Sequence, residues 1–253
     1  MKLNHKIPIV LAVFVLVVAS LACSGGASTQ APTSAPIPPT DTPKPVPTTP
    51  PTSTPEPLPT PDVAATKKAD EFLTALKTFQ DKGYAQQAEG KITELEPFKE
   101  EWAQIGWYQW WPYDNVVSDF VFKGHFKWST ASNTPEISGC GVIFGLQDNK
   151  DHYAVFLDRS RILFLMSRGS NVYNVGKTRG SGRASFGNPA EADFSISVKG
   201  QSAYVAVNSD ITEYTLSMDQ TTEGNFALTL LSGTNKDYGT RCEMTDLVFW
   251  TPK

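Results

Sequence analysis

The side chains best suited to ligand chemistry are five aromatic residues gathered in one short stretch of the chain. They are Trp107, Tyr108, Trp110, Trp111 and Tyr113, separated by Gln109 and Pro112. On a β-strand, Trp107 and Trp111 face one side while Tyr108 and Trp110 face the other, because side chains alternate. Exposed Trp and Tyr rings stack on the apolar faces of sugar rings and suit other amphipathic contacts. An exposed aromatic patch here predicts a ligand-binding site.

The same stretch also has a structural explanation in which both of its faces are buried. One face then packs against the opposite sheet of the fold, and the other lies under a helix that precedes it in the chain. We favour this arrangement from the sequence, because Phe72, Leu76 and Phe79 of that helix need an apolar surface to cover. The two interpretations differ in whether any of the tryptophans stays exposed.

Residues that could carry catalysis are few. His125 has no evident ligand near it, and His152 has only turn aspartates beside it, so we expect both as surface residues of strands. The chain has no Gly-x-Ser-x-Gly nucleophile motif and no glycine-rich phosphate loop. We therefore assign no catalytic residue and expect no cofactor.

Oxygen-bearing side chains occur together in the segment Asp148-Asn149-Lys150-Asp151. They could help to hold calcium, but they lack the long regular spacing of a calcium-binding loop. A tight turn between two strands explains the same residues, since Asn and Asp favour turns. We therefore expect a hairpin turn here and no metal site.

The N-terminus carries the order of features that marks a secretory signal. Lys2 and Lys6 precede an uncharged apolar run, residues 7–22, of about sixteen residues. That length is shorter than the ~20 residues that a membrane-spanning helix needs. The closing Ser-Leu-Ala-Cys resembles the lipobox of bacterial lipoproteins, whose cysteine, here Cys23, is acylated and becomes the mature N-terminus. An ordinary secretory signal or an uncleaved anchor is the alternative for residues 1–22.

Export would leave the other two cysteines, Cys140 and Cys242, in an oxidising compartment, where a pair of cysteines is expected to form a disulfide. The bridge would close a loop of about 100 residues, worth roughly 4.7 kcal/mol on the chain-entropy model. The alternative is two buried free thiols, which are common in protein cores.

Residues 23–61 form a Pro/Thr-rich tract that we expect to be a disordered, extended stalk. Between Pro32 and Pro61 lie 13 of the 19 prolines, and proline fixes φ and removes an amide donor. At about 3.1 Å per residue the tract reaches on the order of 120 Å, enough to hold a domain clear of a membrane.

Residues 62–83 predict one amphipathic helix. Thr60 and Pro61 are typical of a helix start, and Gly83 is suited to end the helix in the left-handed conformation. Apolar residues follow at alternating spacings of four and three: Ala65, Ala69, Phe72, Leu76 and Phe79. We expect this helix to dock on the domain that follows it.

Residues 84–253 predict an all-β domain of short antiparallel strands. The even-numbered residues from Phe120 to Trp128 are mostly aromatic and alternate with polar ones, which is the pattern of a half-buried strand. The expected strands that follow are 140–146, 153–158, 162–166, 194–198, 203–207, 213–216, 226–231 and 243–250, with a long flexible loop at 179–188. Many short strands joined by turns favour an antiparallel β-sandwich or jelly roll.

Two segments carry a family resemblance. The stretch from Gly139 to Leu157, GCGVIFGLQDNKDHYAVFL, resembles a hairpin of concanavalin A-like jelly rolls, a group that includes laminin-G-like and 3-keto-disaccharide-hydrolase-like domains. The order of DFSISV at 193–198, a Lys199-Gly200 turn and AYVAVN at 203–208 is similar to the paired central strands of such folds. The resemblance implies the fold of residues 84–253, and it leaves the function open.

The resemblance also permits a check for one enzyme class. Relatives of this fold that cut β-glucans place Glu-x-Asp-x-Glu or Glu-x-Asp-x-x-Glu on one strand, so that the carboxylates converge. Here Glu191 and Asp193 are followed by Ser195 and Ile196, which leaves the third carboxylate missing. Glu243 and Asp246 are three apart and would face opposite sides of a strand. This departure argues against a retaining glycosidase, although a hydrolase with another acid arrangement stays open.

Taken together, these features predict a non-catalytic binding module, lipid-anchored and exported to the extracellular side of the membrane or the periplasm. Carbohydrate or an envelope protein is the expected partner. A net charge of −4 without a cluster of Lys or Arg excludes the electrostatic footprint of a nucleic-acid binder. The alternatives are a glycoside-acting hydrolase and a structural module of an envelope assembly.

Overall fold

A computed structural model describes residues 63–132, 137–158, 161–177, 179–180 and 187–253. The predicted signal at 1–22, the stalk with Cys23, and the helix-start residues 60–62 lie outside the described residues. Among the helices that the structure describes, none is both long enough and apolar enough to cross a membrane.

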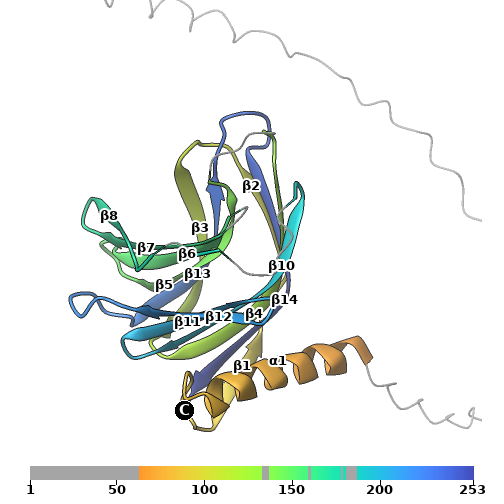
Figure 1. The fold of residues 1–253 in the computed structure, drawn as a ribbon, viewed down its shortest axis with the longest axis vertical. Coiled ribbons are helices and arrows are strands. Elements are labelled where there is room, and N and C mark those ends of the chain that lie inside the picture. The colour runs from red at the N-terminus through yellow and green to blue at the C-terminus, as the bar shows by residue number, and fades with distance from the viewer. Residues whose placement is uncertain (1–62, 133–136, 159–160, 178, 181–186) are drawn as a thin grey trace, which may run out of the picture. The chain divides into compact units, whose positions relative to one another are not determined.

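The described residues form two antiparallel sheets of seven strands each, one packed on the other (Figure 1). In sheet A the order is β1 (Gly90–Glu94), β14 (Thr240–Pro252), β4 (Phe120–Thr130), β10 (Ala190–Lys199), β11 (Ser202–Val207) and β12 (Asp210–Thr215), with β2 (Phe98–Trp102) also paired to β14. In sheet B the order is β3 (Trp107–Val117), β13 (Gly224–Ser232), β5 (Gly139–Leu146), β6 (His152–Leu157), β7 (Arg161–Arg168) and β8 (Asn171–Asn174), with β9 (Arg179–Gly180) paired to β7. This architecture confirms the antiparallel sandwich expected from the sequence.

The space between the sheets is filled by the inward-facing residues of both. The aromatic residues at even positions of β4 are all buried there, as the alternation predicts. Phe126 stacks on Phe194 with ring centroids 4.7 Å apart, and Phe120 stacks on Phe249 at 5.0 Å. Each such side chain contributes about 1.5–3 kcal/mol by leaving water, so this aromatic core holds the two sheets together.

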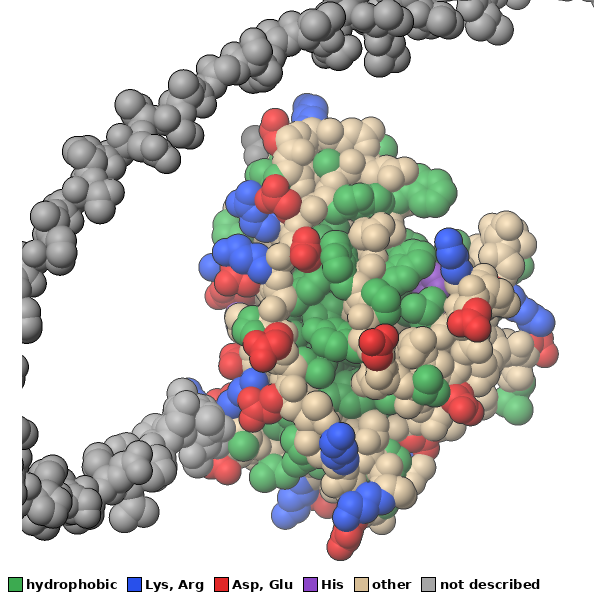
Figure 2. All heavy atoms as spheres, turned by 180° about the vertical axis from the view of Figure 1, so that it is seen from behind, with side chains coloured by type: hydrophobic (Ala, Val, Ile, Leu, Met, Phe, Trp, Pro, Cys, Tyr) green, Lys and Arg blue, Asp and Glu red, His purple; other side chains and the backbone are tan. Residues whose placement is uncertain are grey.

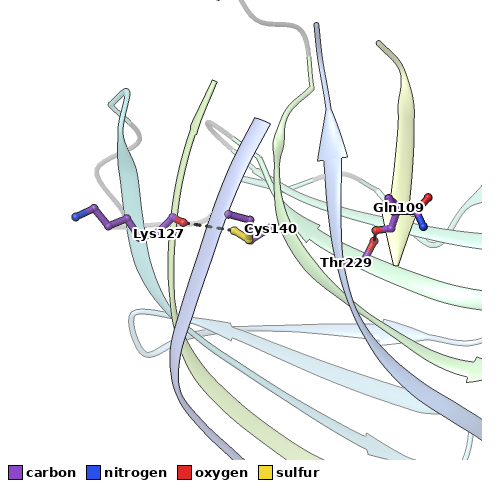
Figure 3. The surroundings of a disulfide bond; sticks show 5 residues. Gln109, Lys127, Cys140 and Thr229 are labelled. Atoms are coloured by element: carbon purple, nitrogen blue, oxygen red, sulfur yellow. Dashed lines mark hydrogen bonds between the residues drawn. A yellow bond between two sulfur atoms is a disulfide. The ribbon is translucent and has the colours of Figure 1, made fainter. Parts of the chain in front are cut away.

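A disulfide joins the two sheets through this core. Cys140 of β5 in sheet B is bonded to Cys242 of β14 in sheet A, and both residues are fully buried. Figure 3 shows the Sγ of Cys140 directed toward the carbonyl oxygen of Lys127, 3.6 Å away. The predicted pairing of these cysteines is confirmed.

One helix, α1 (Val63–Asp81), covers the outer face of sheet A (Figure 1). Its side chains Phe72, Leu76 and Phe79 are buried against a patch on that face formed by Val121, Tyr204, Ala206, Val248 and Trp250. Ala69 is exposed, so the buried stripe is shorter than the sequence pattern suggested. Gly83 follows the helix with a φ of 75°, which is the left-handed conformation expected of it. The predicted docking of the helix on the following domain is confirmed.

The strand and turn expectations are mostly confirmed. The strand expected at 213–216 begins earlier, as β12, and residues 179–180 of the expected flexible loop pair with β7 instead. The segment from Asp148 to Asp151 is the hairpin turn between β5 and β6. In this turn Lys150 has a φ of 68°, and the Asp151 amide donates to Oδ1 of Asn149 at 3.0 Å.

Candidate functional site

Strand β3 lies at the edge of sheet B and presents its aromatic residues on two opposite sides. Trp111 and Tyr113 point toward the core between the sheets, and Trp111 meets Phe98 edge-to-face at 5.1 Å. Tyr108 and Trp110 belong to a separate cluster on the outer face of sheet B. The alternation expected from the sequence is therefore confirmed, and the five predicted site residues do not form one patch.

The favoured expectation that one side of this strand lies under the helix is wrong. Helix α1 packs on sheet A, whereas β3 belongs to sheet B. The reason is that Val121, Val248 and Trp250 of sheet A point outward and give the helix its apolar surface. Trp107, on the same side of β3 as Trp111, is 63% exposed. Figure 2 shows hydrophobic side chains gathered in the middle of the molecule's rear face, with charged side chains around them.

Tyr108 and Trp110 lie over a small apolar cluster, which we call the outer cluster. Its buried floor consists of Ile143, Ala154, Phe156, Leu163, Ala227 and Leu231, and its half-buried upper layer of Tyr108, Trp110, Ile137, Leu146 and Leu165. The ring centroids of Tyr108 and Trp110 are 5.8 Å apart, and those of Tyr108 and Phe156 are 5.3 Å apart. The outer face of sheet B is thus a filled platform with two aromatic rings in its upper layer.

A hydrogen bond fixes one of these rings. The hydroxyl of Tyr108 lies 2.8 Å from Nε2 of His152, and Nδ1 of His152 lies 2.7 Å from the carbonyl oxygen of Lys150. A carbonyl only accepts, so Nδ1 carries the proton, and the Tyr108 hydroxyl donates to Nε2. Only 2% of His152 is exposed, which corrects the sequence expectation of a surface histidine.

Burial governs the protonation of both partners. It lowers the pKa of His152 below the usual 6.5, while the hydrogen bond to Lys150 and the charge of Asp151 oppose this shift. Burial also raises the pKa of Tyr108 to about 12. The pair is therefore neutral at physiological pH, and it lies beside an apolar platform.

Small residues and one side-chain hydrogen bond hold the platform in shape. A Cβ at Gly141 of β5 would lie 2.7 Å from Cδ1 of Phe156, so a larger residue there would displace the floor of the outer cluster. On the neighbouring strand, Oγ1 of Thr229 donates to the carbonyl oxygen of Gln109 at 2.7 Å (Figure 3). This contact ties the edge strand β3 to β13 next to Tyr108 and Trp110.

Trp107, Trp111 and Tyr113 lie on the other side of β3, toward sheet A. Trp111 and Tyr113 are half-buried against the main core, and Trp102 of β2 is half-buried against the same core. Burial raises the pKa of Tyr113, and the nearby charge of Glu96 raises it further. Only Trp107 of these three extends far into solvent.

The candidate carboxylates do not meet the aromatic residues. Glu191 and Asp193 are exposed on β10 of sheet A, where Oδ1 of Asp193 lies 2.9 Å from Nδ1 of His125. Asp246, with a φ of 53°, lies where the pairing of β14 with β4 shifts register. Within the part of the chain that the structure describes, no three His, Cys, Asp or Glu residues are grouped so that they could hold a metal ion.

The arrangement of strands defines the class of the domain. Its two antiparallel sheets of seven strands each, packed face to face, make it a β-sandwich of the jelly-roll type, which is the fold that the sequence resemblance implied. No protein-family model matches the chain, and no curated protein matches it.

Several solved structures are similar in fold at low sequence identity. The carbohydrate-binding module CBM66 from Bacillus subtilis has 10% identity and a TM-score of 0.47, over 65% of this chain and 98% of that one. The apo Crh5 transglycosylase has 9% identity and a TM-score of 0.43, over 66% and 80% of the two chains. Bacillus licheniformis β-glucanase has 10% identity and a TM-score of 0.39, over 55% and 69%. At these values the likenesses carry no argument about what this chain binds or does.

Proposed function

We propose that this protein is an exported, lipid-anchored and surface-displayed module that binds carbohydrate without catalysis. The lipid would be attached at Cys23, and residues 23–61 would hold the domain away from the membrane. The ligand would lie on the outer face of sheet B, against Tyr108 and Trp110. The sequence supports the first two parts of this proposal, and the geometry of the outer cluster supports the third.

The observation that carries the binding site is the pair of half-buried rings held over the outer cluster. Tyr108 and Trp110 are neighbours on one face, and the hydrogen bond to His152 restrains Tyr108. Aromatic rings that are already ordered lose little conformational entropy when a ligand stacks on them. Sugar rings have one apolar face that suits such stacking and hydroxyls that suit a nearby phenol.

The hydrolase alternative receives no comparable support from the described residues. Hydrolysis of a glycosidic bond needs two carboxyl groups on either side of the scissile bond. Glu191 and Asp193 lie on sheet A, away from the aromatic platform of sheet B. On the described outward-facing positions of β3, β13, β5 and β6, alternation places one carboxylate, Asp114 of β3, whereas the reaction needs two.

Two tryptophans on opposite sides of β3 allow a direct test. The purified full-length protein in detergent is screened on a glycan array, together with Trp110→Ala and Trp107→Ala variants whose folding is checked by circular dichroism. Specific glycan binding that is lost in Trp110→Ala and kept in Trp107→Ala is the expected result. Loss in Trp107→Ala alone would move the site to the other side of the strand. No glycan binding by the wild type would contradict the proposed function and favour an envelope protein as partner.

A further inference from the structure

The outer face of sheet B differs from the outer face of sheet A in its charge. Outward positions of sheet A carry many charged residues, among them Lys123, Lys127, Glu191, Asp193, Arg241 and Glu243. Outward positions of sheet B around the outer cluster are Tyr108, Trp110 and Pro112 on β3, Ala227, Thr229 and Leu231 on β13, Gly141 and Ile143 on β5, and His152, Ala154 and Phe156 on β6, while further along β3 the exposed Asp114 adds a negative charge. None of the side chains around the outer cluster is charged, since His152 is neutral.

The arginine that shares this face, Arg161, is already neutralised. Arg161, on β7, has its Nε 2.6 Å from Oδ2 of Asp158, and the backbone amide of Arg161 donates to Oδ1 of the same carboxylate at 3.0 Å. Asp158 is almost completely buried, so the pair is held in place by the fold. Arg161 therefore has its own counter-ion and is not a free cation for an acidic ligand.

The border of the face near the β5–β6 turn is acidic. The turn carries Asp148 and Asp151 around Lys150, which gives a net charge of −1 from these three residues. A carboxylate or sulfate placed on the platform would lose hydration against apolar side chains, and the cations at this border, Lys150 and Arg168, already lie beside acids. The desolvation and electrostatic contributions to the binding free energy are therefore unfavourable for a polyanion. For an uncharged glycan these charge-dependent contributions are close to zero.

The hydrogen-bonding groups of the platform point to a hydroxyl donor. Both ring nitrogens of His152 are occupied, one by Tyr108 and one by the carbonyl of Lys150. The Tyr108 hydroxyl donates its hydrogen bond to Nε2 and also has a side-chain hydrogen bond with Ser167, so toward a ligand its oxygen can act only as an acceptor. The hydroxyls of any sugar supply such donors, so this contact favours a polyol, and the rejection of acidic sugars follows from the charge and the apolar character of the face.

We infer that the ligand class of the outer face of sheet B is an uncharged glycan, and that acidic glycans such as polyuronates and sulfated polysaccharides are rejected. The inference rests on the proposed function, because it specifies the ligand of the same site. It concerns only the class of sugar, not its linkage or its monosaccharide.

The test compares the two classes with the full-length protein in detergent, by calorimetry at low and high salt. The probes are neutral glucans, mannans, galactans and fructans on one side, and a polyuronate and a sulfated galactan on the other. We expect binding to at least one neutral glycan, with an affinity that changes by less than about twofold between the two salt concentrations, since uncharged partners are not screened. Binding restricted to the acidic probes, or weakened about tenfold or more by salt, would overturn the inference and leave carbohydrate binding standing. Binding to neither class would overturn the proposed function itself.

A lysine variant provides an internal control. Lys150 is the exposed cation closest in sequence to His152, and its contact with His152 is made by the backbone carbonyl, which a substitution of the side chain keeps. Lys150→Ala should change the affinity for a neutral glycan by less than about twofold, while Trp110→Ala should reduce it by about tenfold or more. An equally large loss in Lys150→Ala would indicate a charge contact with the ligand and would contradict the inference.

Discussion

The hydroxyl of Tyr108 and Nε2 of His152 lie 2.8 Å apart and connect two strands of sheet B that are not neighbours. Tyr108 is on β3 at the edge of the sheet, His152 is on β6, and β13 and β5 lie between these strands. The bond therefore crosses the outer face and restrains the ring of Tyr108 beside Trp110. A ring fixed in this way can serve a ligand without first having to be ordered.

Removing the hydroxyl should cost stability as well as binding. Tyr108→Phe leaves Nε2 of the buried His152 without its donor, and an unsatisfied buried acceptor costs about 1–3 kcal/mol. The free energy of unfolding, measured by urea denaturation, should fall by about that amount. Tyr173→Phe is the matched control, because Tyr173 is 48% exposed and should change little. Equal effects of the two variants would show that the Tyr108–His152 bond contributes nothing of its own.

Burial of His152 also makes stability depend on pH. Because burial lowers its folded-state pKa below the 6.5 of an unfolded histidine, the unfolded state takes up the proton first as the pH falls. The contribution of neutral His152 to stability is thus complete above about pH 6.5 and is lost below it, until the folded-state pKa is reached. The slope from this one group is at most about 1.4 kcal/mol per pH unit.

The measurement is the free energy of unfolding between pH 8 and pH 4.5 for the wild type and for His152→Gln. The variant should have a flatter curve than the wild type below about pH 6.5. His125→Gln is the control, since His125 is half-exposed on sheet A and lies far from the outer cluster in the fold. If His125→Gln flattens the curve and His152→Gln does not, the assignment to His152 is wrong.

The sequence predicted the two-sided character of the aromatic strand but not the surroundings of each side. Alternation alone separates Tyr108 and Trp110 from Trp107 and Trp111. Periodicity likewise showed that α1 needs an apolar surface to pack on. It does not determine which sheet supplies that surface, because this depends on long-range packing. The helix was therefore assigned to the wrong strand, and the aromatic residues predicted as one site lie on two opposite sides of β3.

The burial of His152 had a sequence signal that was missed. The segment from His152 to Leu157 is apolar at both odd and even positions, which is typical of a strand buried on both faces. That pattern predicts a buried histidine and thus a hydrogen-bonding partner for it. The partner itself, 44 residues away in the chain, follows only from how β3 and β6 are placed in sheet B.

The packing of α1 on sheet A can be tested with two neighbouring positions. Phe72 is buried and Leu73 is 47% exposed on the same helix. Phe72→Ala should lower the free energy of unfolding by about 3–5 kcal/mol, because it removes a large buried ring. Leu73→Ala should change it by less than about 0.5 kcal/mol. Similar small effects of both variants would show that the helix does not pack on the domain in solution.

The disulfide should stabilise the sandwich by a large margin. Cys140 and Cys242 are 102 residues apart, and their bond restricts the unfolded chain over that whole segment. Replacing both by alanine should lower the free energy of unfolding by about 2–5 kcal/mol. The matched measurement is the free energy of unfolding of the wild type with and without a reducing agent. The wild type should lose stability only when its disulfide is reduced. A double variant as stable as the oxidised wild type would contradict this expectation.

The proposed lipid anchor makes a separate prediction that does not depend on the fold. In a bacterial host that is fed a radioactive fatty acid, the wild-type chain should become labelled and should fractionate with membranes. Cys23→Ala should abolish the label, because acylation of a lipoprotein takes place on that cysteine. The control is the Cys140→Ala/Cys242→Ala double variant, which keeps Cys23 and should still be labelled. A Cys23→Ala chain that still carries the label and remains in the membrane fraction would point to acylation elsewhere. An unlabelled wild type found in the soluble fraction would indicate an ordinary secretory signal instead, and one retained in membranes would indicate an uncleaved anchor.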